Sequence, residues 1–376
     1  MTRYGLLSTF PPTRCGLATF TEALATALAA GPGDTADVVR VLDEEDAAAS
    51  RTPSLFVADH LVSGDRESAA HSAITLNGCD VVIVQHEYGI YGGRDGADVV
   101  ALLSALNVPA IVVLHTVLAA PTPHQRRILT EVCARATRVV VMTSAARAEL
   151  TRTYGISAAH IEVIPHGAAA SATAVSTPGR RRRILTWGLI SPGKGIEWGI
   201  EALAQLADIH PPVEYVIAGA THPKVLARFG ETYRTGLVDL SVKLGVSSAV
   251  HLEGRYLDSH ELAALVASAD VVLLPYDSRE QATSGVLVEA LAAGVPVVAT
   301  GFPHAVELLT GGAGLVVPHE DPPAIAAALR AILTSEDVVR RMREAALRQA
   351  AETSWPAVAD RYRLLSVALQ ATAAVA

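Results

Sequence analysis

Short apolar runs rich in Val, Ile and Leu alternate along the chain with longer runs of helical periodicity. The short runs predict strands at Tyr4–Thr9, Asp37–Leu42, Asp80–Gln85, Ala110–Thr116, Arg138–Thr143, Ile161–Pro165, Arg183–Gly188, Glu214–Gly219, Val250–Glu253, Asp270–Pro275, Pro296–Thr300 and Leu315–Pro318. Helices such as Leu17–Ala30 and His124–Ala136 are expected between them. Because apolar strands that alternate with helices form parallel sheets covered on both faces, the pattern predicts an α/β protein.

A segment of small and polar residues, Gly167–Gly179, separates the two halves and is typical of an interdomain linker. The 376 residues fit two domains. We expect Rossmann-like, doubly wound domains over residues 1–172 and 181–354, with the C-terminal helix 355–376 joining the first. Such domains would face a central cleft, where open α/β sheets bind ligands at their strand C-termini.

One predicted helix in the second half carries a single charge. Its body, Val286–Ala293, is apolar except for Glu289, and Thr283 or Ser284 can serve as its N-cap. Gly294 follows where a glycine commonly ends a helix. The carboxylate needs either structural partners or the hydroxyls of a ligand whose phosphate is held by the N–H groups at the helix start. The residues alone leave both interpretations open.

A loop that contains glycine and lysine, Gly188–Gly195, follows a predicted strand. It nearly matches the P-loop pattern, but Gly195 stands where that pattern has Ser or Thr to hold Mg²⁺. This substitution argues against a P-loop NTPase. Lys194 is then either a solvated loop lysine or a charge that neutralises a departing diphosphate.

The loop after the first strand, Phe10–Phe20, contains Gly16 but lacks the Gly-x-Gly-x-x-Gly fingerprint, which argues against a nicotinamide dehydrogenase. Gly16 is either a plain turn glycine or a position where backbone approaches a ligand.

Two predicted strand ends carry histidines, His86 and His115, and Glu87 and Tyr88 follow the first of them. Histidines at neighbouring carboxyl ends of one sheet form a site candidate. A zinc site of His86, Glu87 and His115 is a weaker alternative, because no short-spaced ligand pair supports it.

The segment Glu289-Ala-Leu-Ala-Ala-Gly-Val-Pro-Val-Val298 resembles the donor-site signature of retaining glycosyltransferase family 4, which has the GT-B fold. The resemblance extends over nearly the whole chain. It implies that Glu289 binds the donor ribose and that the helix-start amides bind the donor phosphates. The donor-binding residues implied by the resemblance are Gly16, Gly188, Lys194, Gln281, Ser284, Gly285, Val286 and Glu289.

The same resemblance implies catalytic roles for His115, near the anomeric carbon of the sugar, and for Lys194, beside the leaving diphosphate. It also implies that His86, Glu87 and Tyr88 shape the acceptor pocket. No metal ion and no cofactor are expected, because Lys194 would take the place of a metal.

The chain departs from the family pattern at two positions. Gln281 stands where the family has its first donor-site carboxylate, although an amide still forms hydrogen bonds with hydroxyls. Leu189 stands where the family has an arginine, so Arg14 or Arg255 is a candidate for the missing cation.

The implied function is a metal-independent, retaining transfer of a sugar from a nucleoside-diphosphate sugar to an acceptor hydroxyl. The acceptor is an unidentified carbohydrate, lipid or small molecule. Two alternatives remain open. One is another GT-B enzyme, a sugar phosphorylase or a nucleotide-sugar epimerase, and the other is a non-catalytic nucleotide-sugar-binding protein.

The net charge of −8 argues against nucleic acid as a partner, because binding phosphates along a nucleic acid needs a basic face. The three well-separated cysteines favour a reducing compartment. Neither a signal peptide nor an apolar run of membrane-spanning length is evident in the sequence. We therefore expect a cytoplasmic protein, with peripheral membrane contact left open.

Overall fold

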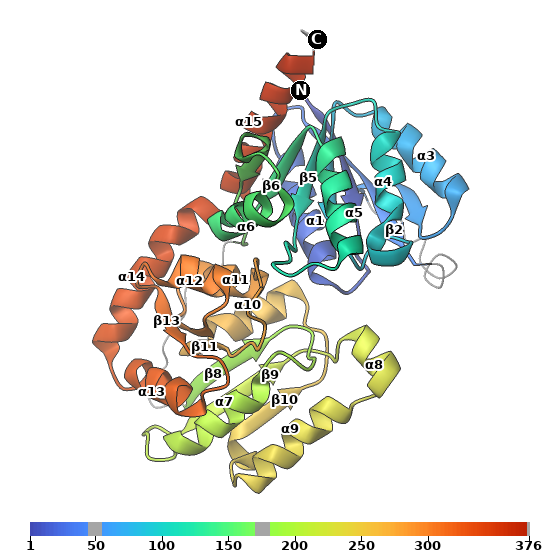
Figure 1. The fold of residues 1–376 in the computed structure, drawn as a ribbon. Coiled ribbons are helices and arrows are strands. Elements are labelled where there is room, and N and C mark those ends of the chain that lie inside the picture. Colours follow the sequence, from blue (N-terminus) through green and yellow to red (C-terminus); the bar gives the residue numbers. More distant parts are fainter. Residues whose placement is uncertain (44–54, 170–180, 374–376) are drawn as a thin grey trace. The chain divides into compact units, whose positions relative to one another are not determined.

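The computed structural model describes residues 1–43, 55–169 and 181–373. These residues form two compact units, Met1–Gly167 with Trp355–Ala376, and Ala168–Ser354 (Figure 1). The predicted linker Gly167–Gly179 lies largely outside the described residues. Each unit is described by itself below.

The N-terminal unit contains a parallel sheet with the strand order β3-β2-β1-β4-β5-β6-β7. Its strands are β1 (Arg3–Ser8), β2 (Thr35–Leu42), β3 (Val57–Val62), β4 (Val81–His86), β5 (Ala110–Leu114), β6 (Arg138–Val141) and β7 (Ile161–Val163). Its helices are α1 (Gly16–Ala29), α3 (Arg66–Asn77), α4 (Asp98–Ser104), α5 (Pro123–Arg135), α6 (Ser144–Tyr154) and α15 (Trp355–Ala373). Each strand predicted for this half overlaps an observed one.

Strand β3 is missing from the sequence prediction. It is an edge strand that pairs only with β2 in the described sheet, and most of its residues are partly exposed. Asp59 and His60 interrupt its apolar positions. A strand with one neighbour does not need the continuous apolar run by which the buried strands were recognised.

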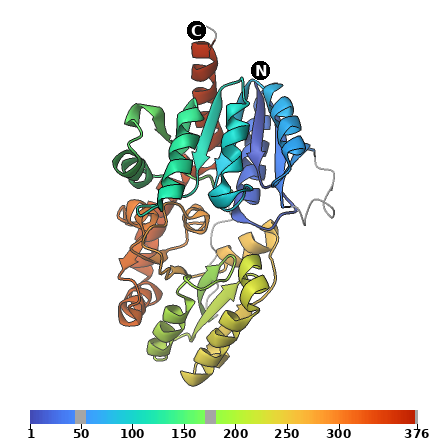
Figure 2. The ribbon, with the colours of Figure 1, turned by 45° about the vertical axis from the view of Figure 1, so that its right-hand side comes forward.

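Helices α1 and α15 pack together on one face of this sheet (Figure 2). Phe20 and Leu24 of α1 share a core with Val358 and Tyr362 of α15, and all four are at most 2% exposed. The last helix of the chain therefore belongs to the N-terminal core, although it follows the C-terminal unit in sequence.

The C-terminal unit contains a second parallel sheet with the order β10-β9-β8-β11-β12-β13. Its strands are β8 (Arg182–Trp187), β9 (Val213–Ala218), β10 (Val250–Glu253), β11 (Val271–Leu274), β12 (Val297–Thr300) and β13 (Gly314–Val317). Its helices are α7 (Ile196–Leu203), α8 (Pro223–Phe229), α9 (Thr232–Lys243), α10 (Ser259–Ala267), α11 (Gly285–Ala292), α12 (Pro303–Leu309), α13 (Pro322–Leu333) and α14 (Glu336–Thr353). All six predicted strands are present.

Two separate cores cover the two faces of the C-terminal sheet. Helices α7, α9 and α13 contribute to one core, α10, α11 and α12 contribute to the other, and α14 contributes residues to both. Both units are thus doubly wound, as the alternation of strands and helices predicts.

The direction of strand succession reverses once in each sheet, between β1 and β4 in the N-terminal unit and between β8 and β11 in the C-terminal unit. At such a switch point the two adjacent loops diverge to opposite faces and leave a crevice at the carboxyl ends of the strands. The candidate residues from the sequence cluster at these two places.

Candidate functional site

The loop after β8 is fixed to the end of β11. The Asp277 N–H donates to the Gly193 carbonyl at 3.0 Å, and the Trp198 indole donates to the Asp277 carboxylate at 2.8 Å. Gly195 has φ of +60°, and a Cβ there would lie 1.8 Å from the Pro275 carbonyl oxygen. Only glycine allows this close approach, so the backbone around Lys194 has a defined position.

The Lys194 side chain lies over an aromatic pair. Its Nζ is 4.2 Å from the centroid of the Tyr276 ring, which also stacks on Phe302 with the ring centroids 5.3 Å apart. Thr300 and His319 donate hydrogen bonds to the Tyr276 carbonyl at 2.7 and 2.8 Å. The ring contact positions the Lys194 ammonium without a carboxylate partner among the described residues, so the ammonium can still pair with an anion.

Helix α11 begins as the sequence indicates. Ser284 is its N-cap and accepts a hydrogen bond from the Leu287 N–H at 3.3 Å, and Gly294 adopts φ of +65° after its end. Among the described residues, the N–H groups of Gly285 and Val286 have no hydrogen-bond acceptor. These two amides are therefore available to a ligand anion.

The Ser284 amide differs from the other two, because it donates to Nδ1 of His304 at 2.8 Å. His304 is a buried residue of α12, 2% exposed. Acceptance at Nδ1 leaves the ring proton on Nε2. The sequence prediction included the Ser284 amide among the phosphate donors, and in this structure that amide is already engaged by His304.

Glu289 lies about one turn beyond Gly285 on α11. The Trp187 indole at the end of β8 donates a hydrogen bond to its carboxylate, and burial raises the carboxyl pKa above its ordinary value. The described residues include no arginine paired with Glu289. A carboxylate with one donor and a burial penalty has acceptor capacity left for ligand hydroxyls.

Gly188 brings the end of β8 next to the start of α11. A Cβ on Gly188 would lie 3.9 Å from the Val286 side chain, and a Cβ on Gly219 would lie 1.9 Å from the Gly188 carbonyl oxygen. Gln281, in the loop before α11, donates from its amide to the Thr283 carbonyl at 3.1 Å. Its carbonyl oxygen is left as an acceptor.

In the N-terminal unit, His115 follows β5. Its Nε2 lies 2.7 Å from the side-chain amide oxygen (Oε1) of Gln85 and so carries the ring proton, which leaves Nδ1 as an acceptor. Burial, with smaller contributions from His166 and His86, lowers the His115 pKa to about 3. A neutral imidazole can orient a sugar hydroxyl but cannot serve as a cation.

The Phe20 ring packs against His115 at 4.9 Å and against His166 and Trp355 at 5.0 Å each, so these aromatic rings form one cluster around Phe20. The sequence prediction did not identify these residues. Phe20 lies in α1, His166 lies in the segment after β7, and Trp355 lies in α15. No local sequence pattern connects positions so far apart.

The predicted acceptor residues are not equally accessible. His86 is fully buried, and burial lowers its pKa to about 4. Glu87 and Tyr88 are partly exposed, and Glu87 accepts hydrogen bonds from the Tyr88 N–H and the Thr116 hydroxyl. Glu87 and part of the Tyr88 side chain are accessible, although the Tyr88 hydroxyl is buried, whereas His86 is fully buried and lies edge-on to the Tyr88 ring at 5.2 Å.

Gly16 is the first residue of α1, and an added Cβ there meets no described atom within 4 Å. His86, Glu87 and His115 do not form a metal site, since no cluster of three or more candidate ligands occurs among the described residues. The zinc alternative is therefore wrong. Cys15, Cys79 and Cys133 are free thiols.

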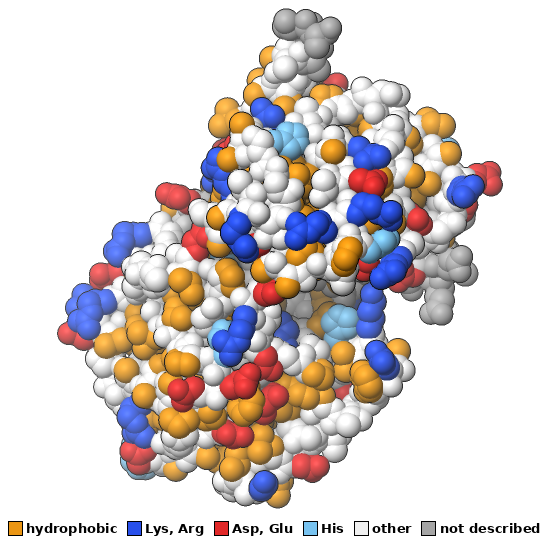
Figure 3. All heavy atoms as spheres, in the orientation of Figure 1, with side chains coloured by type: hydrophobic (Ala, Val, Ile, Leu, Met, Phe, Trp, Pro, Cys, Tyr) orange, Lys and Arg blue, Asp and Glu red, His pale blue; other side chains and the backbone are white. Residues whose placement is uncertain are grey.

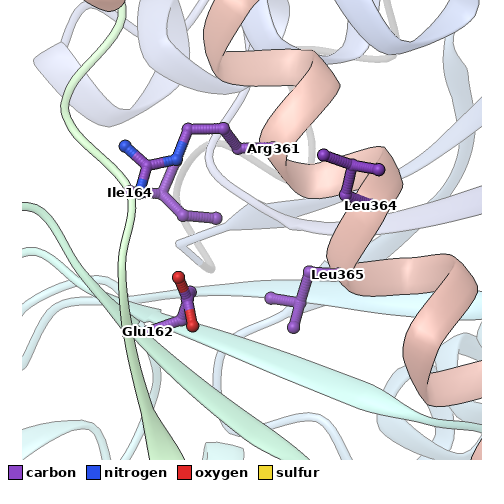
Figure 4. Close-up of a pocket in the computed structure, with 5 residues that line it drawn as sticks. All are labelled: Glu162, Ile164, Arg361, Leu364 and Leu365. Carbon is purple, nitrogen blue, oxygen red and sulfur yellow. The ribbon is translucent and has the colours of Figure 1, made fainter.

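Basic and acidic side chains are interspersed on the face shown in Figure 3. A hollow between β7 and α15 is lined by Glu162, Ile164, Arg361, Leu364 and Leu365 (Figure 4). It contains none of the predicted site residues. Within the described part of the chain, no helix is long and apolar enough to cross a membrane.

Comparison with known proteins gives the family of this chain. Residues 15–171 match the model of Glycosyltransferase Family 4, and residues 181–335 match that of Glycosyl transferases group 1. The chain therefore belongs to glycosyltransferase family 4 and has the GT-B fold.

Among curated relatives, a D-inositol 3-phosphate glycosyltransferase of Corynebacterium efficiens is 33% identical over 50% of this chain and 42% of its own length. Its namesake in Corynebacterium diphtheriae is 28% identical over 68% of this chain and 64% of its own. The chain thus matches less than two thirds of the length of these relatives.

Two solved structures have the same fold at low identity. Anabaena Alr3699/HepE in complex with UDP has a TM-score of 0.77 at 19% identity, covering 98% of this chain and 100% of that one. Sucrose-phosphate synthase from Thermosynechococcus elongatus has a TM-score of 0.77 at 19% identity, covering 99% and 100%.

Proposed function

We propose that this protein is a retaining, metal-independent glycosyltransferase that moves a sugar from a nucleoside-diphosphate sugar to an acceptor hydroxyl. The observation that carries the proposal is the group at the β8–β11 switch point: the unused amides of Gly285 and Val286, the Lys194 ammonium, and Glu289 one turn away. Two amides and a cation suit a diphosphate, and a carboxylate suits a ribose diol.

In this proposal the bond between the anomeric carbon and the β-phosphate oxygen breaks while the acceptor oxygen attacks from the same face. The acceptor proton passes to the departing diphosphate. Lys194 and the α11 amides stabilise the negative charge that develops on that diphosphate. In metal-dependent enzymes a bound metal ion has this role. Since the Tyr276 ring, itself stacked on Phe302, positions the Lys194 ammonium before the reaction, little reorganisation is needed.

The N-terminal unit would supply the acceptor side. His115 is neutral and keeps Nδ1 as an acceptor, which suits orientation of a sugar hydroxyl near the reacting centre. Glu87 and Tyr88 would contact the acceptor, with His86 as the buried support of Tyr88. D-inositol 3-phosphate is the first acceptor to test, because several relatives are named D-inositol 3-phosphate glycosyltransferases.

Calorimetric titration with UDP, GDP and ADP tests the donor site. We expect at least one to bind with a dissociation constant typical of enzyme substrates, about 1 μM to 1 mM, and with the same value in Mg²⁺ and in EDTA. Replacing Glu289 with Ala should weaken this binding about tenfold, because a hydrogen-bonded charged partner of the ribose is lost.

Absence of binding to all three nucleotides would overturn the donor assignment. Binding that requires Mg²⁺ would overturn metal independence alone. Release of a sugar 1-phosphate when inorganic phosphate replaces the acceptor would identify a phosphorylase, and an epimerised nucleotide sugar would identify an epimerase.

A further inference from the structure

The chain segments after β8 and β9 continue to pair beyond the ends of the two strands. The Gly188 N–H donates to the Ala218 carbonyl at 3.0 Å, and the Ile190 N–H donates to the Ala220 carbonyl at 2.9 Å. The His222 N–H then donates to the Ile190 carbonyl at 2.9 Å, in a parallel bridge between Ile190 and Thr221. The loop Gly188–Gly195 is therefore bordered by a second segment, which follows β9 and ends at His222.

Side chains alternate between the two faces of this extension. Ile190 and Thr221 are 2% and 5% exposed and point into the core. Leu189, Ser191 and His222 are partly exposed and so lie on the opposite face. In this parallel register His222 is beside Ser191, on the face that carries Leu189.

A set of side-chain contacts fixes the backbone that presents His222. The Thr221 hydroxyl donates to the Glu231 carboxylate, which lies 3.5 Å from Nε of Arg234. The Arg234 guanidinium in turn donates to the Gly219 carbonyl. Thr221, Glu231 and Arg234 thus form a brace around the segment.

The His222 ring has one defined role and one nitrogen left over. Its Nδ1 accepts the Lys224 N–H at 3.2 Å at the start of α8, so the ring proton is on Nε2. Burial first, then the charges of Lys224 and Lys194, lower the pKa of His222 below its ordinary value. Ser191, the neighbour of His222 in this register, accepts the Lys194 N–H at its carbonyl at 3.2 Å, so the two segments bring His222 close to the Lys194 backbone.

We propose that His222 binds the nucleotide-sugar and that its Nε2–H donates a hydrogen bond to the diphosphate beside Lys194. His222 would thus be the second side chain that contacts the diphosphate, since the Leu189 side chain has no hydrogen-bond donor. This inference rests on the proposed function. Arg255, which the sequence suggested as a replacement for the cation missing at position 189, is instead paired with Glu261 at 2.6 Å on the surface. A neutral imidazole adds a hydrogen bond without adding a second positive charge next to Lys194.

Replacement of His222 by Asn tests the proposal. The Asn carbonyl oxygen keeps the acceptor for the Lys224 N–H, but the Nε2–H is lost. We expect the affinity for the tightest of UDP, GDP and ADP to fall about tenfold in calorimetry. His260→Asn, at an exposed position of α10, is the matched control and should bind as the wild type does.

A rescue variant separates ligand contact from a structural role. Leu189→Arg places a long side chain with hydrogen-bond donors on the same face as His222. The double variant Leu189→Arg/His222→Asn should therefore recover most of the lost affinity. Wild-type affinity in His222→Asn, or a double variant as weak as His222→Asn, would overturn the proposal. If the wild type binds none of the three nucleotides, the proposed function itself fails and this inference fails with it.

Discussion

Replacing Lys194 with Ala should lower kcat by about 10²–10³-fold, the loss typical of removing one group that stabilises transition-state charge. Lys194 is positioned by Tyr276 at 4.2 Å and by the loop contacts of Gly193 and Gly195. Since the charge on the diphosphate grows as the sugar leaves, the loss should appear more strongly in kcat than in KM. Steady-state kinetics with the preferred donor and acceptor measure both.

Lys243→Ala is the matched control, because Lys243 is an exposed lysine at the end of α9 in the same unit. Its kinetics should equal those of the wild type. A Lys194→Ala enzyme with kcat within about threefold of the wild type would contradict the role of Lys194.

Replacing Gly195 with Ala should have the second-largest effect. The added Cβ would lie 1.8 Å from the Pro275 carbonyl oxygen, at a φ of +60° that non-glycine residues rarely adopt. Relief of this overlap requires the loop to move off β11 and to take Lys194 with it. We expect stability to fall by about 1–3 kcal/mol and nucleoside-diphosphate affinity to fall at least about tenfold.

Gly236→Ala provides the control for the glycine replacement. Gly236 lies inside α9, and an added Cβ there meets no described atom within 4 Å. This variant should be at least as stable as the wild type, because Ala favours a helix. Thermal unfolding and calorimetry compare the two variants, and wild-type affinity in Gly195→Ala would show that the Gly195–Pro275 contact does not position the site.

Much of the fold is predictable from the sequence because buried parallel strands need continuous apolar runs. Such runs identify β4 and β11, whereas edge strand β3, with Asp59 and His60 in it, lacks one. Helix ends are also readable, since Ser284 and Gly294 are local signals.

The detail of the site depends on contacts between distant residues, and these are not readable from local patterns. His304 takes the Ser284 amide across twenty residues, and Tyr276 holds Lys194 from a different strand end. His222 comes beside Ser191 only because β8 and β9 pair in parallel. Each of these positions follows from the order and register of the strands.

The most direct test of retaining, metal-independent transfer follows the anomeric proton by NMR during turnover of an α-linked nucleotide sugar in EDTA. UDP-glucose, GDP-mannose and ADP-glucose serve as donors, with D-inositol 3-phosphate as acceptor and water as the fallback acceptor. We expect that nucleoside diphosphate is released and that the first sugar product has the α configuration. A β product formed first, or donors that bind yet stay intact, would contradict this expectation.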